Sequence, residues 1–465
     1  MTERIATGCV GLDEILNGGI PANTITVLMG APGTGKTIMA EGIAFCNATE
    51  ERPALYLTTL SEPLEKFIFH GQHYAFFNSE KVGKAVIYED LGIAVRKAGV
   101  EKLSEIVTDL ILKYKPAYLF IDSFKGLNEL LQSTIERRTV IYDLATVLTA
   151  YKCTTFLIGE YAQEMTTDLP EFAIADVVLK LEKYSTNVRE QRFLCVEKLR
   201  GSNSIPGLHA FSISDKGIEM YPRLLSPSVV PTYQPKVERV NSGIDGLDDM
   251  IDQGFWRGST TLVAGPSGSG KTIMALHFIR EGALRSEPGL YVGFQENPSQ
   301  MARIMLNLGW NTTQLLENGN FELMYRSPVE MQLDSVAAEI FERVRTGKVR
   351  RIAIDALGDL ERCSMDRQRF ADFIYALTQW FAVENVTCMM TTELRELFEL
   401  RHISDQEISN MSDNLVVIGF TPGPEMKRTI RIIKTRGSRH DNRLHELDIN
   451  EKGAVVKKSH DRRND

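Results

Sequence analysis

Residues 30–37 read Gly30-Ala31-Pro32-Gly33-Thr34-Gly35-Lys36-Thr37 and match the pattern G-x-x-x-x-G-K-[S/T] at every fixed position. The stretch 25–29 before them is apolar and β-branched, as in a strand, and the stretch 38–44 after them is typical of a helix. Glycines allow such a loop to turn several backbone N–H groups toward one phosphate, and the helix N-terminus adds partial positive charge. The segment therefore predicts a nucleotide site rather than a glycine-rich turn with a chance lysine.

The side chains at the end of this loop have separate expected roles. Lys36 is expected to reach the β- and γ-phosphates, and the Thr37 hydroxyl is expected to bind Mg²⁺. The expected cofactors are therefore ATP and Mg²⁺. The first group of nucleotide-binding residues is Gly33, Thr34, Gly35, Lys36 and Thr37.

The loop occurs a second time. Residues 265–272 repeat it, and Lys271 lies 235 positions after Lys36. At the same offset the segment Gly8-x-x-Gly11-Leu12-Asp13 matches Gly243-x-x-Gly246-Leu247-Asp248. An ungapped match of this length indicates a duplicated domain. The second group of nucleotide-binding residues is Gly268, Ser269, Gly270, Lys271 and Thr272.

Composition narrows the class of protein. The chain of 465 residues is 43% hydrophobic and 25% charged, which is ordinary for a globular protein. No run approaches the ~18 apolar residues of a membrane span, and no signal peptide is recognisable, so a cytoplasmic protein without a membrane partner is expected. The net charge of −8 disfavours a nucleic-acid-coating protein. The six cysteines are scattered, which favours reduced thiols over a metal site.

The duplication sets the expected domain organisation. The first domain is predicted over 1–221, a proline-spaced linker over 222–236, the second domain over 237–456, and a short basic tail over 457–465. In each domain, short β-branched runs alternate with amphipathic helical segments. This pattern predicts an α/β fold with a mostly parallel twisted sheet and helices on both of its faces, which places the nucleotide at the carboxyl ends of the strands.

Individual elements can be placed from the same pattern. Each domain is expected to close with two strands joined by a charged turn, forming an antiparallel extension at the sheet edge: 177–181 with 192–196, and 415–418 with 429–433. The other predicted strands are 54–58, 117–121, 155–158, 289–294, 351–354 and 386–390, and helices are predicted over 100–113 and 336–345.

Two aspartates end apolar strands at matched places in the two repeats. Asp122 follows Tyr118-Leu119-Phe120-Ile121, and Asp355 follows Arg351-Ile352-Ala353-Ile354. A strand ending in aspartate is the second feature of phosphate-loop sites, so Asp122 and Asp355 are expected to hold Mg²⁺ with Thr37 and Thr272. The alternative is that each aspartate caps the helix that follows.

Hydrolysis also needs a group that orients or deprotonates water. Such a carboxylate is expected at the end of the strand after the loop helix, where the candidates are Glu62 and Glu296. The alternative is that both are first-turn glutamates that complement a helix dipole.

With these motifs the chain resembles the KaiC family over nearly its whole length. The resemblance also rests on Lys198-Leu199-Arg200-Gly201-Ser202 and on residues 434–441, Lys-Thr-Arg-Gly-Ser-Arg-His-Asp. It implies two tandem RecA-like P-loop NTPase domains and a two-tiered homohexamer with ATP between neighbouring subunits. By this resemblance Lys198, Arg200, Lys434 and Arg436 reach the neighbour's γ-phosphate, where added positive charge stabilises the transition state. Alternatively, they pair with surface carboxylates beside a hairpin.

The chain departs from the family pattern at three places. The family's two adjacent glutamates are replaced by Ser61-Glu62 and Gln295-Glu296, which implies slow turnover or one tier that mainly holds nucleotide. Clock-type relatives phosphorylate neighbouring serine and threonine residues, and Ser409 matches the serine position. Asn410 replaces the threonine, so Ser409 is the single candidate phosphoacceptor of that pair. Alternatively, Ser409 is an ordinary helix or turn serine.

The resulting hypothesis is an ATP-hydrolysing signalling switch with serine autokinase activity in its second domain. The resemblance implies a KaiB-like or other signalling protein as its partner. Two alternatives remain: a RecA-like nucleic-acid motor or recombinase, and a nucleotide-gated scaffold with little turnover. Fold alone does not separate them. Acidic charge, the duplication and the lack of an added DNA-binding motif disfavour the motor.

Overall fold

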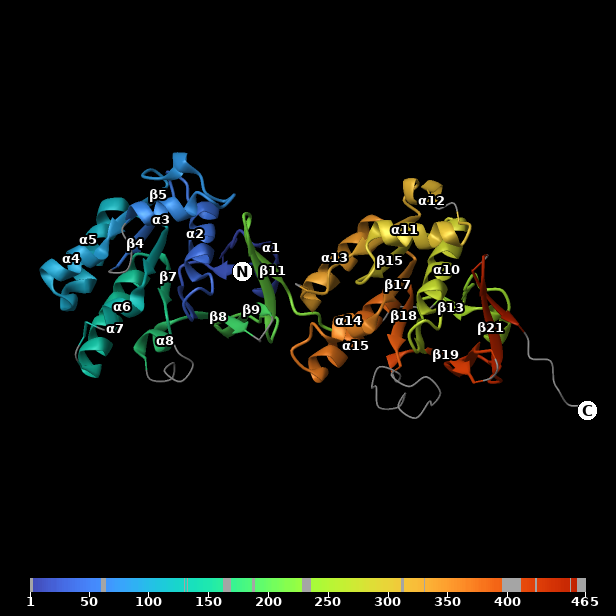
Figure 1. The fold of residues 1–465 in the computed structure, drawn as a ribbon. Coiled ribbons are helices and arrows are strands. Elements are labelled where there is room, and N and C mark those ends of the chain that lie inside the picture. The colour runs from blue at the N-terminus through green and yellow to red at the C-terminus, as the bar shows by residue number, and fades with distance from the viewer. Residues whose placement is uncertain are drawn as a thin grey trace, which may run out of the picture. The chain divides into compact units, whose positions relative to one another are not determined.

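The computed structural model describes residues 3–59, 64–128, 130–131, 133–161, 169–185, 189–227, 236–310, 313–329, 331–394, 411–422, 425–451 and 453–457. The chain divides into two units, Met1–Arg223 and Leu224–Asp465 (Figure 1). The domain and linker boundaries drawn from the sequence stay predictions, since 228–235 lie outside the described residues.

The first unit is built on one nine-stranded sheet among its described residues. In spatial order its strands are β5 (Val86–Asp90), β4 (Ala54–Thr58), β6 (Tyr118–Asp122), β7 (Thr154–Gly159), β3 (Ile25–Gly30), β8 (Val177–Ser185), β9 (Glu190–Leu199), β10 (His209–Ser214) and β11 (Gly217–Tyr221). Its helices are α1 (Val10–Ile15), α2 (Lys36–Asn47), α3 (Leu64–Gly71), α4 (Leu91–Ala98), α5 (Leu103–Tyr114), α6 (Phe124–Asn128), α7 (Thr134–Ala150) and α8 (Pro170–Ile174). Two short strands, β1 (Arg4–Ile5) and β2 (Ile20–Pro21), pair separately.

The second unit repeats this strand order. Its sheet runs β16 (Phe321–Tyr325), β15 (Gly289–Gly293), β17 (Arg351–Asp355), β18 (Thr387–Glu393), β14 (Thr260–Gly265), β19 (Asn414–Thr421), β20 (Lys427–Thr435), β21 (His445–Asn450) and β22 (Gly453–Lys457). Its helices are α9 (Leu247–Met250), α10 (Lys271–Leu284), α11 (Pro298–Asn307), α12 (Thr313–Glu317), α13 (Leu333–Thr346), α14 (Leu357–Glu361) and α15 (Arg367–Val383), and β12 (Arg239–Val240) pairs with β13 (Phe255–Trp256).

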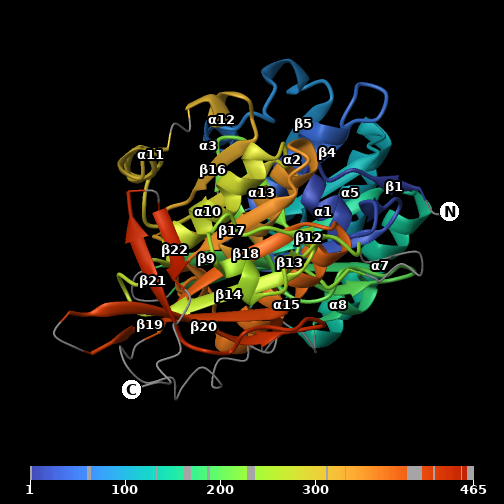
Figure 2. The same cartoon turned by 90° about the vertical axis from the view of Figure 1, so that its right-hand side faces the viewer.

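Strand direction confirms the predicted mostly parallel sheets with antiparallel extensions. In each sheet the first six strands of the spatial order pair in parallel. They are β5, β4, β6, β7, β3 and β8 in the first unit, and β16, β15, β17, β18, β14 and β19 in the second. The predicted antiparallel pairs are β8 with β9 and β19 with β20. Each extension also contains two further strands, which the sequence pattern did not predict. Figure 2 shows those of the second unit, in red, beyond β14.

The central parallel strands of each sheet are buried on both faces, because successive side chains of a strand point to opposite faces and helices cover both. In β3, Leu28 packs on one face with Ala40 and Ala44 of α2. Val27 packs on the other face in a cluster that includes Leu144 of α7. The second unit has two corresponding clusters, one with α13 and α15 and one with α10. The prediction of helices on both faces is therefore confirmed.

Predicted element boundaries differ from the observed ones by a few residues. The helix predicted over 100–113 begins with a 3₁₀ turn, Val100–Lys102, and continues as α5. The helix predicted over 336–345 lies inside α13, and Lys457, assigned to the tail, is the last residue of β22. Among the described residues, no helix combines the length and apolar character needed to cross a bilayer.

Candidate functional site

The first P-loop connects β3 to α2. A Cβ atom at Gly30 would lie 2.4 Å from the Leu181 carbonyl oxygen and 2.8 Å from Thr34 Oγ1, so this position requires glycine. Lys36 begins α2, and its Nζ donates hydrogen bonds to the carbonyl oxygens of Gly30 (3.0 Å) and Ala31 (2.9 Å). The loop thus holds the ammonium group against its own backbone, beside the N-terminus of α2.

A hydroxyl and a carboxylate meet at the end of the sheet beside this loop. Thr37 Oγ1 donates to Asp122 Oδ2 at 2.8 Å, and the Tyr56 hydroxyl donates to the same oxygen at 3.0 Å. Burial raises the pKa of Asp122, while the bonds from Thr37 and Tyr56 oppose that shift. The residues predicted to hold Mg²⁺ in the first repeat are therefore brought together.

The second P-loop has the same arrangement at its lysine. Lys271 Nζ donates to the carbonyl oxygens of Gly265 (2.9 Å) and Pro266 (2.8 Å). Burial lowers the pKa of both Lys271 and Lys36. Ser269 is fully buried, and its Oγ has no hydrogen-bond partner among the described residues.

The Asp355 carboxylate accepts one more side-chain hydrogen bond than the Asp122 carboxylate. Thr272 Oγ1 donates to Asp355 Oδ2 at 2.7 Å, and the Tyr291 hydroxyl donates to the same oxygen at 2.6 Å. Thr391 donates to Oδ1 of Asp355. At the matching position of β7 the first unit has Ile158, which has no hydroxyl to offer.

Both sites fit a magnesium nucleotide by the chemistry of their donors. Mg²⁺ prefers hard oxygen ligands, and each site offers a threonine hydroxyl beside an aspartate. A lysine ammonium and the N-terminus of a helix complement a phosphate chain. The unpartnered Ser269 hydroxyl adds a polar group within the second loop. These residues are suited to bind a nucleoside polyphosphate and to neutralise its charge.

Sequence reasoning missed two further pairs near the loops. Tyr56 and Tyr291 donate hydrogen bonds to the aspartates, although the sequence pattern predicts only that they lie in strands. Glu160 lies after β7, with Oε1 4.0 Å from Lys36 Nζ, and Glu393 ends β18 and opposes the lowered pKa of Lys271. Comparison of the two repeats could have identified both pairs. Tyr56 and Tyr291 are 235 positions apart, like the two P-loop lysines, and Glu160 and Glu393 are 233 positions apart, like the two strand-ending aspartates.

The two candidate glutamates differ in how they can be assessed. Glu62 lies outside the described residues. Glu296 lies three positions after β15 and is partly exposed. Burial, followed by the negative charge of Asp355, raises its pKa. Glu296 is therefore close enough to the second aspartate to feel its charge, while its neighbour Gln295 donates to Asp359 Oδ2 at 3.1 Å.

The basic residues of the first unit lie away from their own P-loop. Lys198 pairs in register with Val178, which pairs with Val27. Gly30 begins the loop three residues after Val27, which is about 10 Å along a strand. Lys198 Nζ instead donates to the Phe172 carbonyl oxygen at 3.1 Å.

Arg200 follows Lys198 at this end of the sheet. Its NH1 lies 3.5 Å from Asp176 Oδ1, and its NH2 donates to the Ala173 carbonyl oxygen. The Asp176 contact matches the alternative of pairing with a surface carboxylate.

The second unit repeats this displacement. Lys434 pairs with Leu415, which pairs with Leu262, again three residues before the glycine that begins the loop. Lys434 Nζ donates to the Ser412 carbonyl oxygen at 2.6 Å, and Arg436 NH1 lies 3.7 Å from Asp413 Oδ1. Neither basic pair therefore lies at the P-loop of its own unit.

Glu41 distinguishes the first site from the second. It lies on α2 one turn after Thr37 and is almost completely buried. Burial and the nearby Asp122 raise its pKa to about 8, although a hydrogen bond with Tyr88 opposes the shift. At the same repeat offset the second unit has Leu276, so this ionisable group belongs to the first site alone.

Two P-loops, each with a threonine–aspartate pair at the carboxyl edge of a parallel sheet, define a tandem P-loop nucleotide-binding protein. The chain belongs to the KaiC ATPase family, whose model, described as "ATPase: KaiC", matches residues 5–224 and 240–461. This result confirms the resemblance and the tandem fold inferred from the motifs.

Curated relatives match along almost the whole chain. The circadian clock oscillator protein KaiC of Picosynechococcus sp. is 27% identical over 471 residues, covering 98% of this chain and 90% of the relative. The circadian clock protein KaiC3 of Synechocystis sp. is 26% identical over 471 residues, covering 98% and 92%. The KaiC protein of Synechococcus elongatus is 26% identical over 469 residues, covering 98% and 89%.

The raised pKa of Glu41 predicts a pH-dependent stability. Between the reference value of 4.5 and about 8, the folded chain keeps a proton that the unfolded chain releases. The free energy of unfolding should therefore fall as pH rises through this range, by at most about 1.4 kcal/mol per pH unit for one proton. Replacing Glu41 with leucine, the residue of the second repeat, should remove this dependence.

Scanning calorimetry of the full chain at several values between pH 5 and pH 8, without nucleotide or metal, measures this effect. The melting temperature of Glu41→Leu should rise relative to wild type as pH increases. The exposed Glu80→Gln variant serves as the control and should follow wild type. Parallel pH curves for Glu41→Leu and wild type would contradict the assignment.

Proposed function

We propose that the chain is an ATP-hydrolysing signalling switch that assembles as a homohexamer with ATP and Mg²⁺ between neighbouring subunits. The observation that carries the proposal is the displacement of Lys198 and Lys434 by three strand residues from their own P-loops, with Arg200 and Arg436 two residues farther along the chain. We propose that basic groups in this position act on a nucleotide held by another copy. Membership of an ATPase family supports the hydrolytic activity.

Within each subunit the proposed roles follow the contacts. Lys36 and Lys271 bind the phosphates once they leave their backbone acceptors. Thr37 with Asp122, and Thr272 with Asp355, hold Mg²⁺, which neutralises developing phosphate charge when bound. Tyr56 and Tyr291 fix the orientation of the aspartates. The further nucleotide contacts are proposed for the backbone of Gly33, Thr34, Gly35, Gly268, Ser269 and Gly270.

Glu62 and Glu296 are proposed to orient and deprotonate the attacking water. The raised pKa of Glu296 supports this role, because a base whose pKa lies nearer the working pH accepts a proton more effectively. The lost proton then resides on the carboxylate, while a lysine and an arginine from the neighbour stabilise the charge on the transferred group.

The printed names of the relatives suggest a setting for this activity. They are called circadian clock proteins, so we place the proposed switch in a signalling pathway with a KaiB-like or other protein partner. The net charge of −8 does not favour nucleic acid as the ligand. ATP turnover that does not change on addition of single-stranded DNA is the expected behaviour.

Sharing of sites between copies predicts complementation in the second tier. Lys271→Ala removes the phosphate contact, and Arg436→Ala removes the group donated to the neighbour. Each variant alone should lose hydrolysis in that tier. In a random mixed ring, about one interface in four combines an intact loop with an intact arginine. ATP turnover after subunits are mixed should therefore exceed the mean of the two variants.

The two unmixed variants at the same total concentration provide the control for this experiment. Turnover equal to their mean, with mixed rings demonstrated by mass spectrometry, would contradict a nucleotide site shared between copies.

The glutamate roles predict slow hydrolysis with retained binding. Glu62→Gln and Glu296→Gln should each reduce turnover in their own tier, and the double variant should lose about 10²–10⁴-fold, the usual contribution of a general base. Phosphate release and ATP binding are measured in parallel. The exposed Glu317→Gln variant is the control. A loss below about tenfold in the double variant would count against both assignments.

Serine autokinase activity in the second domain is the finer part of the proposal. Ser409 lies outside the described residues, and in the sequence it aligns with Phe172 when both are counted back from Asp413 and Asp176. The backbone of Phe172 bonds to Lys198, one of the residues proposed to act on a neighbour's nucleotide. In the second repeat the corresponding Lys434 bonds to the Ser412 carbonyl oxygen, three residues after Ser409, so the basic residues contact this segment in both repeats.

Long incubation with Mg-ATP should add one phosphate to part of the protein, because Asp405, Glu407 and Asp413 repel the new negative charge. Intact-mass analysis and peptide mapping should place it on Ser409, and Ser409→Ala should remove it. Ser412→Ala is the matched control and should still be phosphorylated. A phosphate on Ser404 or Ser412 alone, or none at all, would refute the assignment.

A further inference from the structure

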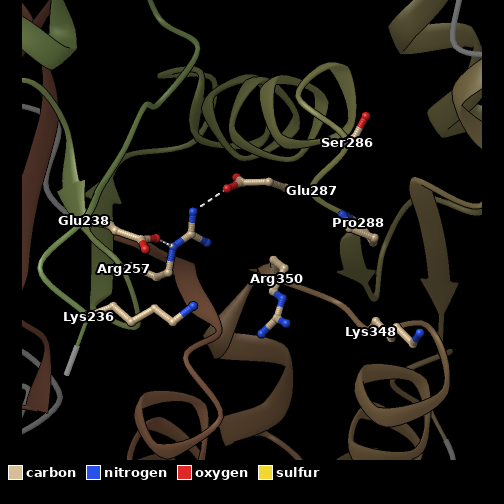
Figure 3. A pocket seen from close by; sticks show the side chains of 8 residues that line it. All are labelled: Lys236, Glu238, Arg257, Ser286, Glu287, Pro288, Lys348 and Arg350. Atoms are coloured by element: carbon tan, nitrogen blue, oxygen red, sulfur yellow. Dashed lines mark hydrogen bonds and ion pairs between the residues drawn. The ribbon is translucent and has the colours of Figure 1, made fainter. Parts of the chain in front are cut away.

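The second unit has a basic cavity at the amino-terminal ends of its parallel strands, whereas the P-loop lies at their carboxyl ends. The cavity measures about 460 Å³ (Figure 3). Pro288 and Arg350 immediately precede the first residues of β15 and β17, so the cavity lies at the amino-terminal ends of these parallel strands. The P-loop follows the carboxyl end of β14. The lining residues are Lys236, Glu238, Arg257, Ser286, Glu287, Pro288, Lys348 and Arg350.

Two arginines neutralise the carboxylates of this cavity. Arg257 Nε lies 2.6 Å from Glu238 Oε2, and its NH2 group also pairs with Glu287 (Figure 3). The buried Arg351 contacts the other oxygen of Glu287 through Nε at 2.8 Å and NH2 at 2.7 Å. Burial would raise the pKa of Glu287, but Arg257 and Arg351 bring it below its usual value. Both carboxylates are therefore paired with arginines, and their charge is not available to the other cations of the cavity.

Three further cations at the cavity have no such compensation. Lys236, Lys348 and Arg350 are exposed, and no hydrogen bond or ion pair of their side chains occurs among the described residues. Figure 3 shows Lys236 and Arg350 extending into the space beside Arg257, with Lys348 farther along the rim. Like charges gathered at one cavity repel each other, and a multivalent anion would relieve that repulsion.

The first unit lacks this cluster although it has the same fold. Strand pairing matches Gly289 and Arg351 with Ala54 and Tyr118. The residue before Tyr118 is Ala117, which therefore corresponds to Arg350. Arg257 and Lys348 correspond to Ala22 and Lys115 by the same offsets. The charge is therefore a property of the second unit and not of the fold.

We propose that this cavity binds a compact anion with two or three linked phosphate groups. Three uncompensated cations match the charge of such a chain, whereas a single carboxylate would neutralise one of them. The volume lies within the range of about 300–1,000 Å³ that is usual for small-molecule sites. The Arg350 guanidinium can form paired hydrogen bonds with phosphate oxygens, and Lys236 and Lys348 add point charges.

The residues that line this cavity are distinct from those of both nucleotide sites. Its cations come from the segment before β12 and from the loop between α13 and β17, and none of them belongs to a P-loop. Binding at this site can therefore be measured while the P-loops are filled. The proposal does not depend on the activity inferred for the P-loops.

Calorimetric titration of sodium tripolyphosphate into the full-length protein at saturating Mg-ADP tests the proposal. Wild type should bind one tripolyphosphate per chain beyond the blocked P-loops, with affinity that falls as salt rises. Lys236→Ala/Arg350→Ala should weaken this binding about tenfold or more, because two charge-assisted contacts are lost. Lys115→Ala, at the matched position of the first unit, should leave it unchanged.

The remaining outcomes overturn the proposal. Wild type without an additional site, or a double variant that binds as tightly as wild type, would exclude polyphosphate recognition by these residues. Lys236→Gln/Arg350→Gln removes the same charges with less loss of side-chain volume, and retained ADP binding shows that either variant is folded. If the same substitutions alter self-association in sedimentation without any phosphate binding, the cations serve a protein contact instead.

Discussion

The hydrogen bond between the threonine at the start of each loop helix and a strand-ending aspartate organises both halves of the molecule. Thr37 and Asp122 come from elements attached to β3 and β6, which are separated in the sheet by β7. They meet because parallel strands end at a common edge, where the connecting loops converge. The same bond between Thr272 and Asp355 spans β18 in the second unit. This bond thereby fixes the P-loop and the helix after it relative to the strand ends where a ligand would bind.

The two copies keep this frame but differ in the electrostatics around it. In the first unit, buried Glu41 contacts Tyr88 behind the threonine–aspartate pair. The repeat offset places Leu276 and Leu323 there in the second unit, where Thr391 instead adds a donor to Asp355. The first site therefore has an additional group that can bind a proton. The second site has apolar side chains in that place, and its Asp355 carboxylate accepts an additional hydrogen bond. Two units with the same strand order can in this way support nucleotide sites with different turnover.

Features that depend on residues close together in the sequence could be predicted, and features that depend on tertiary contacts could not. The P-loops and strand-ending aspartates have fixed spacing because phosphate and Mg²⁺ chemistry imposes it, and the parallel sheets followed from the alternation of elements. The four outer strands are only five or six residues long, and the alternation of polar and apolar residues within them, as in Phe211-Ser212-Ile213-Ser214, was overlooked. Glu41 resembles a surface residue in a helix pattern, because its burial arises from tertiary packing. Tyr56 resembles a core residue, since its hydroxyl partner is distant in sequence. Glu62 and Ser409 remain predictions.

The register that separates each basic pair from its own P-loop has a consequence for how the protein responds to its abundance. In the proposed assembly, a dissociated chain carries the loop half of one site and the basic half of another, but no complete site. Turnover would then depend steeply on the amount of protein present, because each working centre requires two copies. Dilution alone would lower ATP turnover, and a higher protein concentration would restore it, without any change in ATP concentration. Expression level would therefore act as an input to the switch.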